Sequence, residues 1–317
     1  MAKAVIDPGL EVQRIQAMLT RERLAVDLCD GNRTAFLTHV GAAPRLAPGA
    51  WIAHRQLIMA LALANLSPQV RASLARSVLV EWGREFGVGR LKLTALASGL
   101  PLGGSSLLMR ARSGLRVLYT WALGPRASVH ECDWMLLRAQ PSWASDAPPR
   151  AIGVRGLETL TQLGGGAVVV LVPSAVAARQ IANVAGRALP LTAHARFAPF
   201  LEDQDADATL LLWPHDALGA ASLERREIST LVLVAAPEDV RQTAMHWASA
   251  RPGVEIVDAA CPGRMSREGL VHYWRACGRP KILLRGDPQW AREGRRWLES
   301  QGATVARESE ATQLGLF

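Results

Sequence analysis

The stretch Ala167-Val-Val-Val-Leu-Val172 is an uninterrupted apolar run rich in β-branched residues. Such a run is typical of a strand that is buried on both faces of a parallel sheet. Comparable short runs follow it along the chain at Thr209–Trp213, Thr230–Val234, Val254–Val257, Lys281–Leu284 and Thr304–Ala306. The chain from residue 167 onwards is therefore predicted to supply the strands of an α/β domain.

Helix signals lie between these runs. Ser174 can cap a helix over the residues that follow it, and Asp287-Pro288 combines an N-cap with proline at the first helical position. One amphipathic stripe ends at Gly278, and its members recur at helical spacing: Leu270, Tyr273, Trp274 and Cys277. Strands that alternate with helices predict a doubly wound, mainly parallel α/β domain with right-handed crossovers.

The composition is that of a globular protein with room for two domains, because 49% of the 317 residues are hydrophobic and 20% are charged. The apolar runs are far shorter than the roughly 20 residues that a membrane-spanning helix needs. The segment Met1–Asp7 lacks the apolar region of a secretory signal. We therefore expect a cytoplasmic protein without membrane contact. The four cysteines are far apart in the sequence, which argues against a disulfide framework or a zinc knuckle.

Turn-forming residues gather in Gln140–Pro149, where hydrophobic periodicity is weak. This composition predicts an interdomain linker. The expected organisation is a first domain over residues 1–150, the α/β domain over residues 151–308 and a flexible C-terminal tail over residues 309–317.

The first domain is predicted to be mostly helical. Helical periodicity covers three segments: Leu10–Arg23, Trp51–Leu66 and the residues after Ser67-Pro68. Two short helices are expected next, over Arg90–Ser98 and Ser105–Ser113, on either side of a Gly99–Gly104 turn. An alternating run, Leu115–Leu123, then turns at Gly124-Pro125 as a hairpin would. Helix, turn, helix and hairpin in this order resemble a winged helix-turn-helix.

The net charge of +8 comes almost entirely from arginine, because only three lysines occur. A biased genome can produce such a surplus, and so can contact with phosphate, which the planar guanidinium group binds bidentately. Three arginines lie where a winged helix meets DNA, and we expect them to contact DNA: Arg110, Arg112 and Arg116. A later group is more typical of solvated faces: Arg264, Arg267, Arg275, Arg279, Arg292, Arg295 and Arg296.

The pentapeptide Gln313-Leu-Gly-Leu-Phe317 follows a polar leader, Arg307–Thr312. It resembles the Gln-Leu-x-Leu-Phe peptide by which bacterial replication and repair proteins bind the β sliding clamp, the β subunit of DNA polymerase III. The resemblance makes Leu314 one of the defining residues. It implies that Leu316 and Phe317 enter an apolar pocket of the clamp while Gln313 hydrogen-bonds at the rim of that pocket. The resemblance covers five residues and implies a partner, not an activity. The alternative is a tail that folds back on its own core.

A second resemblance concerns the α/β half, which is similar to the first motor domain of superfamily 2 helicases. Ala167–Pro173 resembles the strand called motif Ia, and Thr230–Glu238 falls where the Asp-Glu box would be. The departures are large. The second strand ends in Ala235-Ala-Pro-Glu238 instead of Asp-Glu, and no Gly-x-x-x-x-Gly-Lys-Ser/Thr sequence occurs. The resemblance therefore implies a motor fold without ATP hydrolysis.

Candidate catalytic residues follow predicted strands, where open α/β sheets place their ligands: His215, Asp216, Asp258 and Asp287. Each also has a structural explanation as a turn residue or helix cap. The acidic run Glu202–Asp207 is more typical of a solvated loop, and His130-Glu131-Cys132 lacks a second pair of zinc ligands at usable spacing. No catalytic residue, metal or cofactor is therefore expected.

The sequence favours a non-catalytic accessory protein of DNA replication or repair that binds the clamp and contacts DNA. Two alternatives stay open. One is a DNA-acting enzyme recruited by the clamp, either a helicase-like ATPase or a nuclease. The other is a DNA-binding transcriptional regulator.

Overall fold

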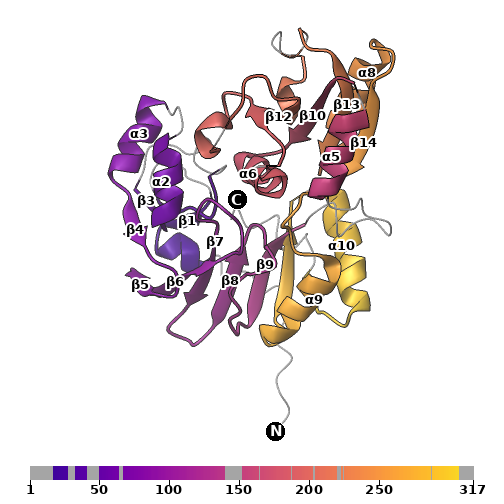
Figure 1. Ribbon diagram of the computed structural model, residues 1–317. Helices are drawn as coiled ribbons and strands as arrows, with labels where there is room; N and C mark the ends of the chain where they lie inside the picture. Colours follow the sequence, from indigo (N-terminus) through magenta and orange to yellow (C-terminus); the bar gives the residue numbers. More distant parts are fainter. Residues whose placement is uncertain are drawn as a thin grey trace. The chain divides into compact units, whose positions relative to one another are not determined.

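A computed structural model describes residues 17–27, 33–40, 50–63, 67–139, 152–163, 165–186, 188–202, 204–219, 223, 225–286 and 288–306. The chain forms two compact units (Figure 1). Unit 1 combines Met1–Ala62, Leu66–Asp146 and Arg264–Phe317, and unit 2 combines Leu63–Asn65 with Ala147–Gly263. Unit 1 is thus assembled from both ends of the chain, whereas the sequence-based division assigned residues 264–306 to the second domain.

A six-stranded sheet forms one layer of unit 1, in the order β15-β9-β8-β7-β6-β5. Its strands are β5 (Glu85–Val88), β6 (Leu91–Ala97), β7 (Ser105–Arg110), β8 (Arg116–Thr120), β9 (Trp134–Arg138) and β15 (Lys281–Arg285). β8, β9 and β15 are parallel to one another, and the strands from β5 to β8 alternate in direction. The last strand to enter the sheet therefore comes from beyond unit 2 in the sequence.

A four-stranded parallel sheet, in the order β1-β2-β3-β4, forms the other layer. Its strands are β1 (Leu24–Val26), β2 (Thr34–Phe36), β3 (Trp51–His54) and β4 (Val78–Val80). The helices α2 (Arg55–Leu63) and α3 (Pro68–Ala75) lie against it (Figure 1). Ser67 caps α3 as predicted, because its side chain accepts a hydrogen bond from the Val70 amide.

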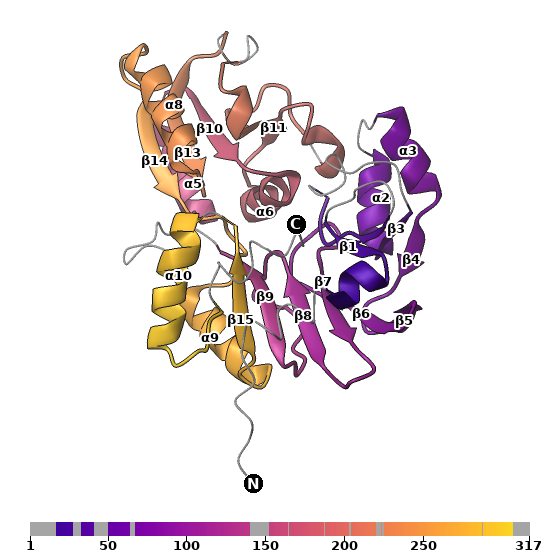
Figure 2. The ribbon, with the colours of Figure 1, turned by 180° about the vertical axis from the view of Figure 1, so that it is seen from behind.

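The two sheets of unit 1 share one apolar core. It contains Leu24 and Phe36 from the smaller sheet and Leu93, Tyr119 and Leu136 from the larger one. A second core covers the opposite face of the larger sheet, where α9 (Arg267–Ala276) and α10 (Pro288–Ser300) pack. Figure 2 shows α10 alongside β15 from behind. The predicted stripe on α9 is confirmed, since all four of its members are buried in this second core.

Unit 2 is the predicted parallel α/β layer. Its strand order is β11-β12-β10-β13-β14, and each neighbouring pair is parallel. The strands are β10 (Ala167–Val172), β11 (Leu191–Ala193), β12 (Leu210–Pro214), β13 (Ile228–Val234) and β14 (Glu255–Ala259), and the helices are α5 (Val154–Leu163), α6 (Ala175–Ala185) and α8 (Glu238–Ser249). Every residue of β10 is buried, as expected for the central strand. Ser174 caps α6.

The predicted helix-turn-helix is wrong. The two segments expected to be short helices form β6 and β7, which pair antiparallel across the Gly99–Gly104 turn. The expected hairpin is also wrong, because β8 and β9 are parallel neighbours. The physical reason lies in the alternation within β6, where Leu91, Leu93 and Ala95 are buried in the shared core and Lys92 is exposed. A period of two fits a strand and not a helix.

The prediction of a mostly helical first domain is also wrong. Trp51–His54 form β3 before α2 begins, and α3 ends at Ala75, so that Val78–Val80 form β4. Sheet pairing replaces helix where apolar residues are contiguous instead of spaced by three or four. The predicted linker, Gln140–Pro149, lies outside the described residues. None of the helices in the described ranges is both long and apolar enough to cross a membrane.

Candidate functional site

Polar side chains of unit 1 gather where the strands of both sheets end. Asp27 follows β1, and Thr38 and His39 follow β2. In the larger sheet, Trp121 follows β8, Arg138 ends β9 and Arg285 ends β15. These positions share the carboxyl edge of parallel strands, which is where α/β proteins bind ligands. We call this group the strand-end cluster: Asp27, Thr38, His39, Tyr119, Trp121, Arg138 and Arg285.

Asp27 is the buried centre of the strand-end cluster. Its carboxylate accepts a hydrogen bond of 2.7 Å from the Thr38 amide, a second from the Thr38 hydroxyl, and a third of 3.1 Å from the Tyr119 hydroxyl. The two sheets are thereby joined through one carboxylate. Burial raises the pKa of Asp27 to about 6, although these hydrogen bonds and the Arg138 charge oppose the rise.

Trp121 holds an imidazole and a guanidinium group in the strand-end cluster. The His39 ring stacks on it with 4.9 Å between ring centroids, and the Arg138 guanidinium carbon lies 4.0 Å from its ring centroid. His39 Nδ1 lies 3.8 Å from the Asp27 carboxylate. The three side chains are half-buried. A flat aromatic surface, a guanidinium group and an imidazole are thus held together beside a buried acid.

A second polar network lies at the ends of β3 and β4. His54 stacks on Trp82 at 3.9 Å, and its Nε2 lies 3.5 Å from Glu81. Trp82 Nε1 donates a 3.0 Å hydrogen bond to the Ser105 hydroxyl at the start of β7. Burial lowers the pKa of His54, against the opposing influence of Glu81. The network connects the two sheets, and its contacts are typical of structural support.

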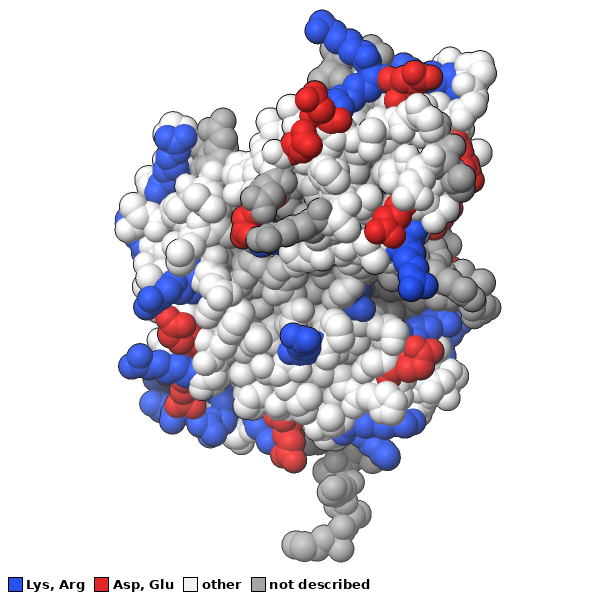
Figure 3. All heavy atoms as spheres, in the orientation of Figure 1, with Lys and Arg blue, Asp and Glu red and all other residues white. Residues whose placement is uncertain are grey.

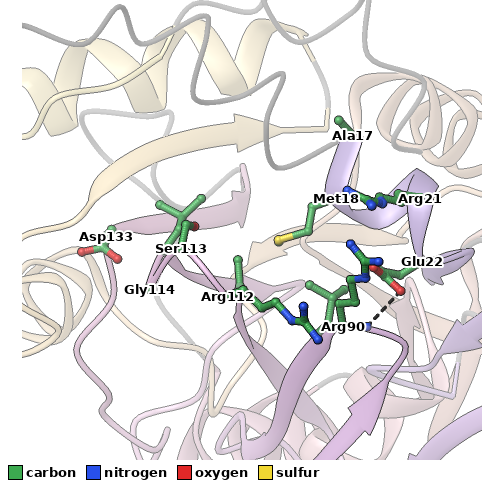
Figure 4. A pocket seen from close by; sticks show the side chains of 12 residues that line it. Ala17, Met18, Arg21, Glu22, Arg90, Arg112, Ser113, Gly114 and Asp133 are labelled. Carbon is green, nitrogen blue, oxygen red and sulfur yellow. Dashed lines mark hydrogen bonds between the residues drawn. The ribbon is translucent and has the colours of Figure 1, made fainter.

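A basic pocket lies at the opposite, amino-terminal edge of the same sheets. It has a volume of about 930 Å³, and three arginines line it: Arg21, Arg90 and Arg112. Figure 4 shows them entering from three places, namely the helix before β1, the turn between β5 and β6, and the turn after β7. Within the described residues, none of the three forms an ion pair. Three cationic groups around one hollow can bind phosphate oxygens.

The acidic residues of this pocket, Glu22 and Asp133, already have hydrogen-bond partners. Glu22 accepts a 2.9 Å hydrogen bond from the Arg90 amide, which Figure 4 marks. Asp133 accepts one of 2.7 Å from the Arg116 amide, and its carboxylate lies 3.6 Å from the Arg116 side chain. The guanidinium groups of Arg21 and Arg112 therefore keep their charge available for an anion.

The three arginines predicted to contact DNA fall on one β-hairpin instead of a recognition helix. Arg110 and Arg116 are cross-strand partners, and Arg112 lies in the turn between them. Arg110 bonds to Glu85 at 2.8 Å, and Arg116 pairs with Glu131 at 3.3 Å. Only Arg112 of the three lines the pocket. Figure 3 shows that lysine and arginine side chains gather around β5 and β6, with acids among them.

The arginines of the later group, from Arg264 to Arg296, differ in their surroundings. Arg295 donates to the Ala306 carbonyl at 3.0 Å, and Arg267 lies over the Trp297 ring at 5.2 Å. Arg275, Arg292 and Arg296 are exposed. These contacts are typical of packing and of a solvated helix face.

The strand-end residues predicted in unit 2 have structural partners. Arg196 Nη1 donates to both carboxylate oxygens of Asp216, at 2.7 and 2.8 Å, and Asp258 pairs with Arg241. His215 Nε2 lies 3.1 Å from the Val234 carbonyl oxygen, and burial lowers its pKa. Asp287 lies outside the described residues. In the described ranges, no three His, Cys, Asp or Glu side chains are grouped to hold a metal ion.

The peptide Gln313–Phe317, which was predicted to bind the clamp, also lies outside the described residues, which end at residue 306. Sequence reasoning missed the strand-end cluster and Arg21 and Arg90 of the basic pocket. Asp27 could have been noticed, because Leu24-Ala-Val-Asp27 is an apolar run that ends in an acid. The pairing of β9 with β15 could not have been predicted from the sequence, since nearly 150 residues separate these strands.

The comparisons with known proteins find a structure with a similar fold, but they do not assign the chain to a family. No protein-family model matches the chain, and no curated protein does. A protein of unknown function from Enterococcus faecalis is similar in structure, with a TM-score of 0.58 and 12% identity over 86% of this chain and 79% of that one. Identity this low supports a shared fold alone.

Two further solved structures align poorly. CmlA, a diiron β-hydroxylase from Streptomyces venezuelae, has a TM-score of 0.26 and 11% identity over 71% of this chain and 43% of its own. YhfI, a metallo-β-lactamase fold protein from Bacillus subtilis, has a TM-score of 0.23 and 10% identity over 72% of this chain and 75% of its own.

Proposed function

We propose that this protein is a non-catalytic accessory protein of DNA replication or repair. It binds the β sliding clamp through Gln313, Leu314, Leu316 and Phe317, and it contacts DNA through the basic pocket. The single observation that carries the proposal is the Gln313-Leu-Gly-Leu-Phe317 peptide. Its two leucines and phenylalanine supply apolar anchors for a pocket, and its glutamine supplies a rim hydrogen bond.

The basic pocket supports the DNA part of the proposal. Arg112 presents an unpaired guanidinium group beside Arg21, within the described residues, and Arg110 and Arg116 flank it on the same hairpin. A net charge of +8 adds long-range attraction for a polyanion. In this arrangement Arg112 binds phosphate directly, whereas Arg110 and Arg116 mainly position the hairpin through their acidic partners. Backbone contacts of this kind give affinity without sequence preference.

The alternatives have lost support. A transcriptional regulator would lack the predicted helix-turn-helix for reading a DNA sequence, because strands occupy that segment. A nuclease was inferred from strand-end aspartates, and Asp216 and Asp258 are bound to arginines. The motor-domain resemblance of unit 2 stays a prediction.

The clamp proposal is tested by co-elution of the purified full chain with the bacterial clamp. Deletion of residues 313–317 should abolish the complex without changing the unfolding temperature, because the described cores end at residue 306. Gly315→Ala is the matched control, since glycine occupies the unspecified position of the motif. Retention of the complex after the deletion would refute the proposal.

A further inference from the structure

The basic pocket has an apolar floor beneath its arginines. Three apolar side chains line it: Met18, Leu91 and Leu115. Leu91 is buried in the core that the two sheets of unit 1 share, and Met18 and Leu115 pack against that core while staying half-buried. The core therefore reaches the surface inside the pocket. Any group that enters the pocket meets apolar surface and not only charge.

The rim of the pocket is cationic. Arg21, Arg90 and Arg112 are exposed, and within the described residues their guanidinium groups have no hydrogen bond or ion pair. Figure 4 shows the Met18 side chain between those of Arg112 and Arg21. An apolar surface is thus bordered by positive charges that come from different elements. A ligand that fits both must combine an apolar group with anionic groups beside it.

The nearest acid is held at the side of the pocket. A Cβ atom at Gly89 would collide with the Glu22 carboxylate, so that only glycine leaves room for the acid against the turn between β5 and β6. The Arg90 amide donates to the same carboxylate at 2.9 Å, as Figure 4 marks. Glu22 is therefore fixed by the turn and does not form an ion pair with Arg21 or Arg112 in the described part of the chain.

The size of the pocket distinguishes among forms of DNA. Its volume of about 930 Å³ is at the upper end of the range for pockets that hold small molecules. Duplex DNA keeps its bases stacked inside the helix and presents mainly phosphates to such a hollow. A single strand can place one base in the pocket, because its bases are already unpaired. The faces of a base pack on apolar side chains and on guanidinium planes.

We propose that the basic pocket binds single-stranded DNA, with one base inserted against Met18 and Leu115 and the flanking phosphates at Arg21 and Arg112. This assignment rests on the proposed DNA contact and names the form of DNA that the pocket binds. Every base has a face of this kind, so that binding is tolerant of sequence. The protein should therefore bind a single strand more tightly than a duplex.

The test is fluorescence anisotropy of the full chain at low salt with three labelled ligands. They are decathymidylate, an abasic strand with the same number of phosphates, and a hairpin with ten base pairs. Base insertion predicts that decathymidylate binds about fivefold or more tightly than the abasic strand. It also predicts weaker binding of the hairpin than of decathymidylate, whereas contact with phosphates alone favours the higher charge density of the duplex.

Variants separate the floor of the pocket from its rim. Met18→Gln should remove the preference for decathymidylate over the abasic strand, and Met18→Leu, which keeps the apolar surface, should retain it. Arg112→Gln should weaken the binding of all three ligands. Arg71→Gln is the matched control for charge and should change nothing, since Arg71 is exposed on α3 and does not line the pocket. Thermal unfolding verifies that each variant is folded at the assay temperature.

The outcomes distinguish this assignment from the proposed function. Equal binding of decathymidylate and the abasic strand would overturn base insertion and leave the DNA contact standing. Weaker binding of the abasic strand by Met18→Gln, to the same degree as of decathymidylate, would also overturn it, because Met18 would then act on the shape of the pocket. Failure of all three ligands to bind would refute the DNA contact itself.

Discussion

At the scale of single residues, the protein buries one acid, Asp27, close to the Arg138 guanidinium group and the His39 ring. Asp27 is buried under the strand ends and receives hydrogen bonds from Thr38 and Tyr119. Burial disfavours its charged form more than those bonds favour it, so that its pKa rises from 3.8 to about 6. Such an acid makes the stability of the protein depend on pH.

The Asp27→Asn variant tests this dependence. A carboxyl group whose pKa is raised in the folded state takes up its proton more readily there than in the unfolded chain. The wild type should therefore lose stability relative to Asp27→Asn as the pH rises from about 4 to about 6, by an amount on the order of 3 kcal/mol. Urea unfolding at several pH values measures the difference.

Other groups face Asp27, and the experiment needs a control for them. His39, Tyr119 and Arg138 all interact with it, and the His39 Nδ1 atom lies 3.8 Å from its carboxylate. The same comparison in a His39→Gln background isolates the aspartate. A stability difference between the wild type and Asp27→Asn that does not vary with pH would show that the pKa of the carboxyl group is not perturbed.

Arg112 is the residue on which the proposed DNA contact depends most. Arg112→Gln should lower DNA affinity at low salt and reduce the slope of log affinity against log salt by about one, as expected for one lost phosphate contact. Arg116→Gln should change the slope less, since Arg116 is paired with Glu131 and Asp133. Filter binding over a salt series measures both. Equal slopes for Arg112→Gln and the wild type would exclude a phosphate contact at this residue.

At the scale of elements, the α/β half was predictable and the first half was not. Apolar runs such as Val168–Leu171 identify buried parallel strands without further information. In β6 the alternation was visible, yet short mixed segments of leucine and alanine also suit a helix. Partners far away in the sequence decide the outcome, since β6 gains its stability by pairing with both β5 and β7.

The same limit explains what was missed in the candidate sites. Arg112 was singled out together with Arg110 and Arg116 because the three coincide with a predicted winged helix-turn-helix, and that segment forms strands instead. Arg138 and Arg285 carry no local signal, and only the β9–β15 pairing brings them together. Motifs formed by neighbouring residues are visible in a sequence, whereas clusters formed by sheet topology are not.

Alanine substitution along β6 tests the corrected assignment. Leu91→Ala and Leu93→Ala should each cost about 2–5 kcal/mol, because both side chains are buried in the core shared by the two sheets. Lys92→Ala should stay within about 0.5 kcal/mol of the wild type. In a helix, positions 91 and 93 would lie on opposite faces and could not both be costly. Denaturant unfolding that found only one of the two leucines costly would favour the helix.

At the scale of the whole molecule, the proposed function combines two weak contacts. The proposed clamp peptide and the basic pocket would each give modest affinity, but a clamp bound through the peptide would hold the pocket close to DNA. Tethering can raise apparent affinity by a factor of about 10²–10⁴ without any new contact. We therefore expect tighter binding to DNA that carries a loaded clamp than to bare DNA.

The Leu316→Ala variant is the control for tighter binding to DNA that carries a loaded clamp. Leu316→Ala should remove the gain from the loaded clamp while leaving the affinity for bare DNA unchanged, because residue 316 is distant in sequence from the basic pocket. Fluorescence anisotropy of labelled primed DNA, with and without clamp, measures both quantities. A gain that survives in Leu316→Ala would mean that another part of the protein binds the clamp.

The most direct measurement is the dissociation constant of the full chain for the isolated clamp, determined by surface plasmon resonance for the wild type, Phe317→Ala and Gly315→Ala. Clamp binding through the peptide predicts measurable binding by the wild type and Gly315→Ala, and a loss of at least about tenfold for Phe317→Ala, because an anchor residue of the peptide is removed. Equal affinity of the wild type and Phe317→Ala, or no binding by the wild type, would contradict it.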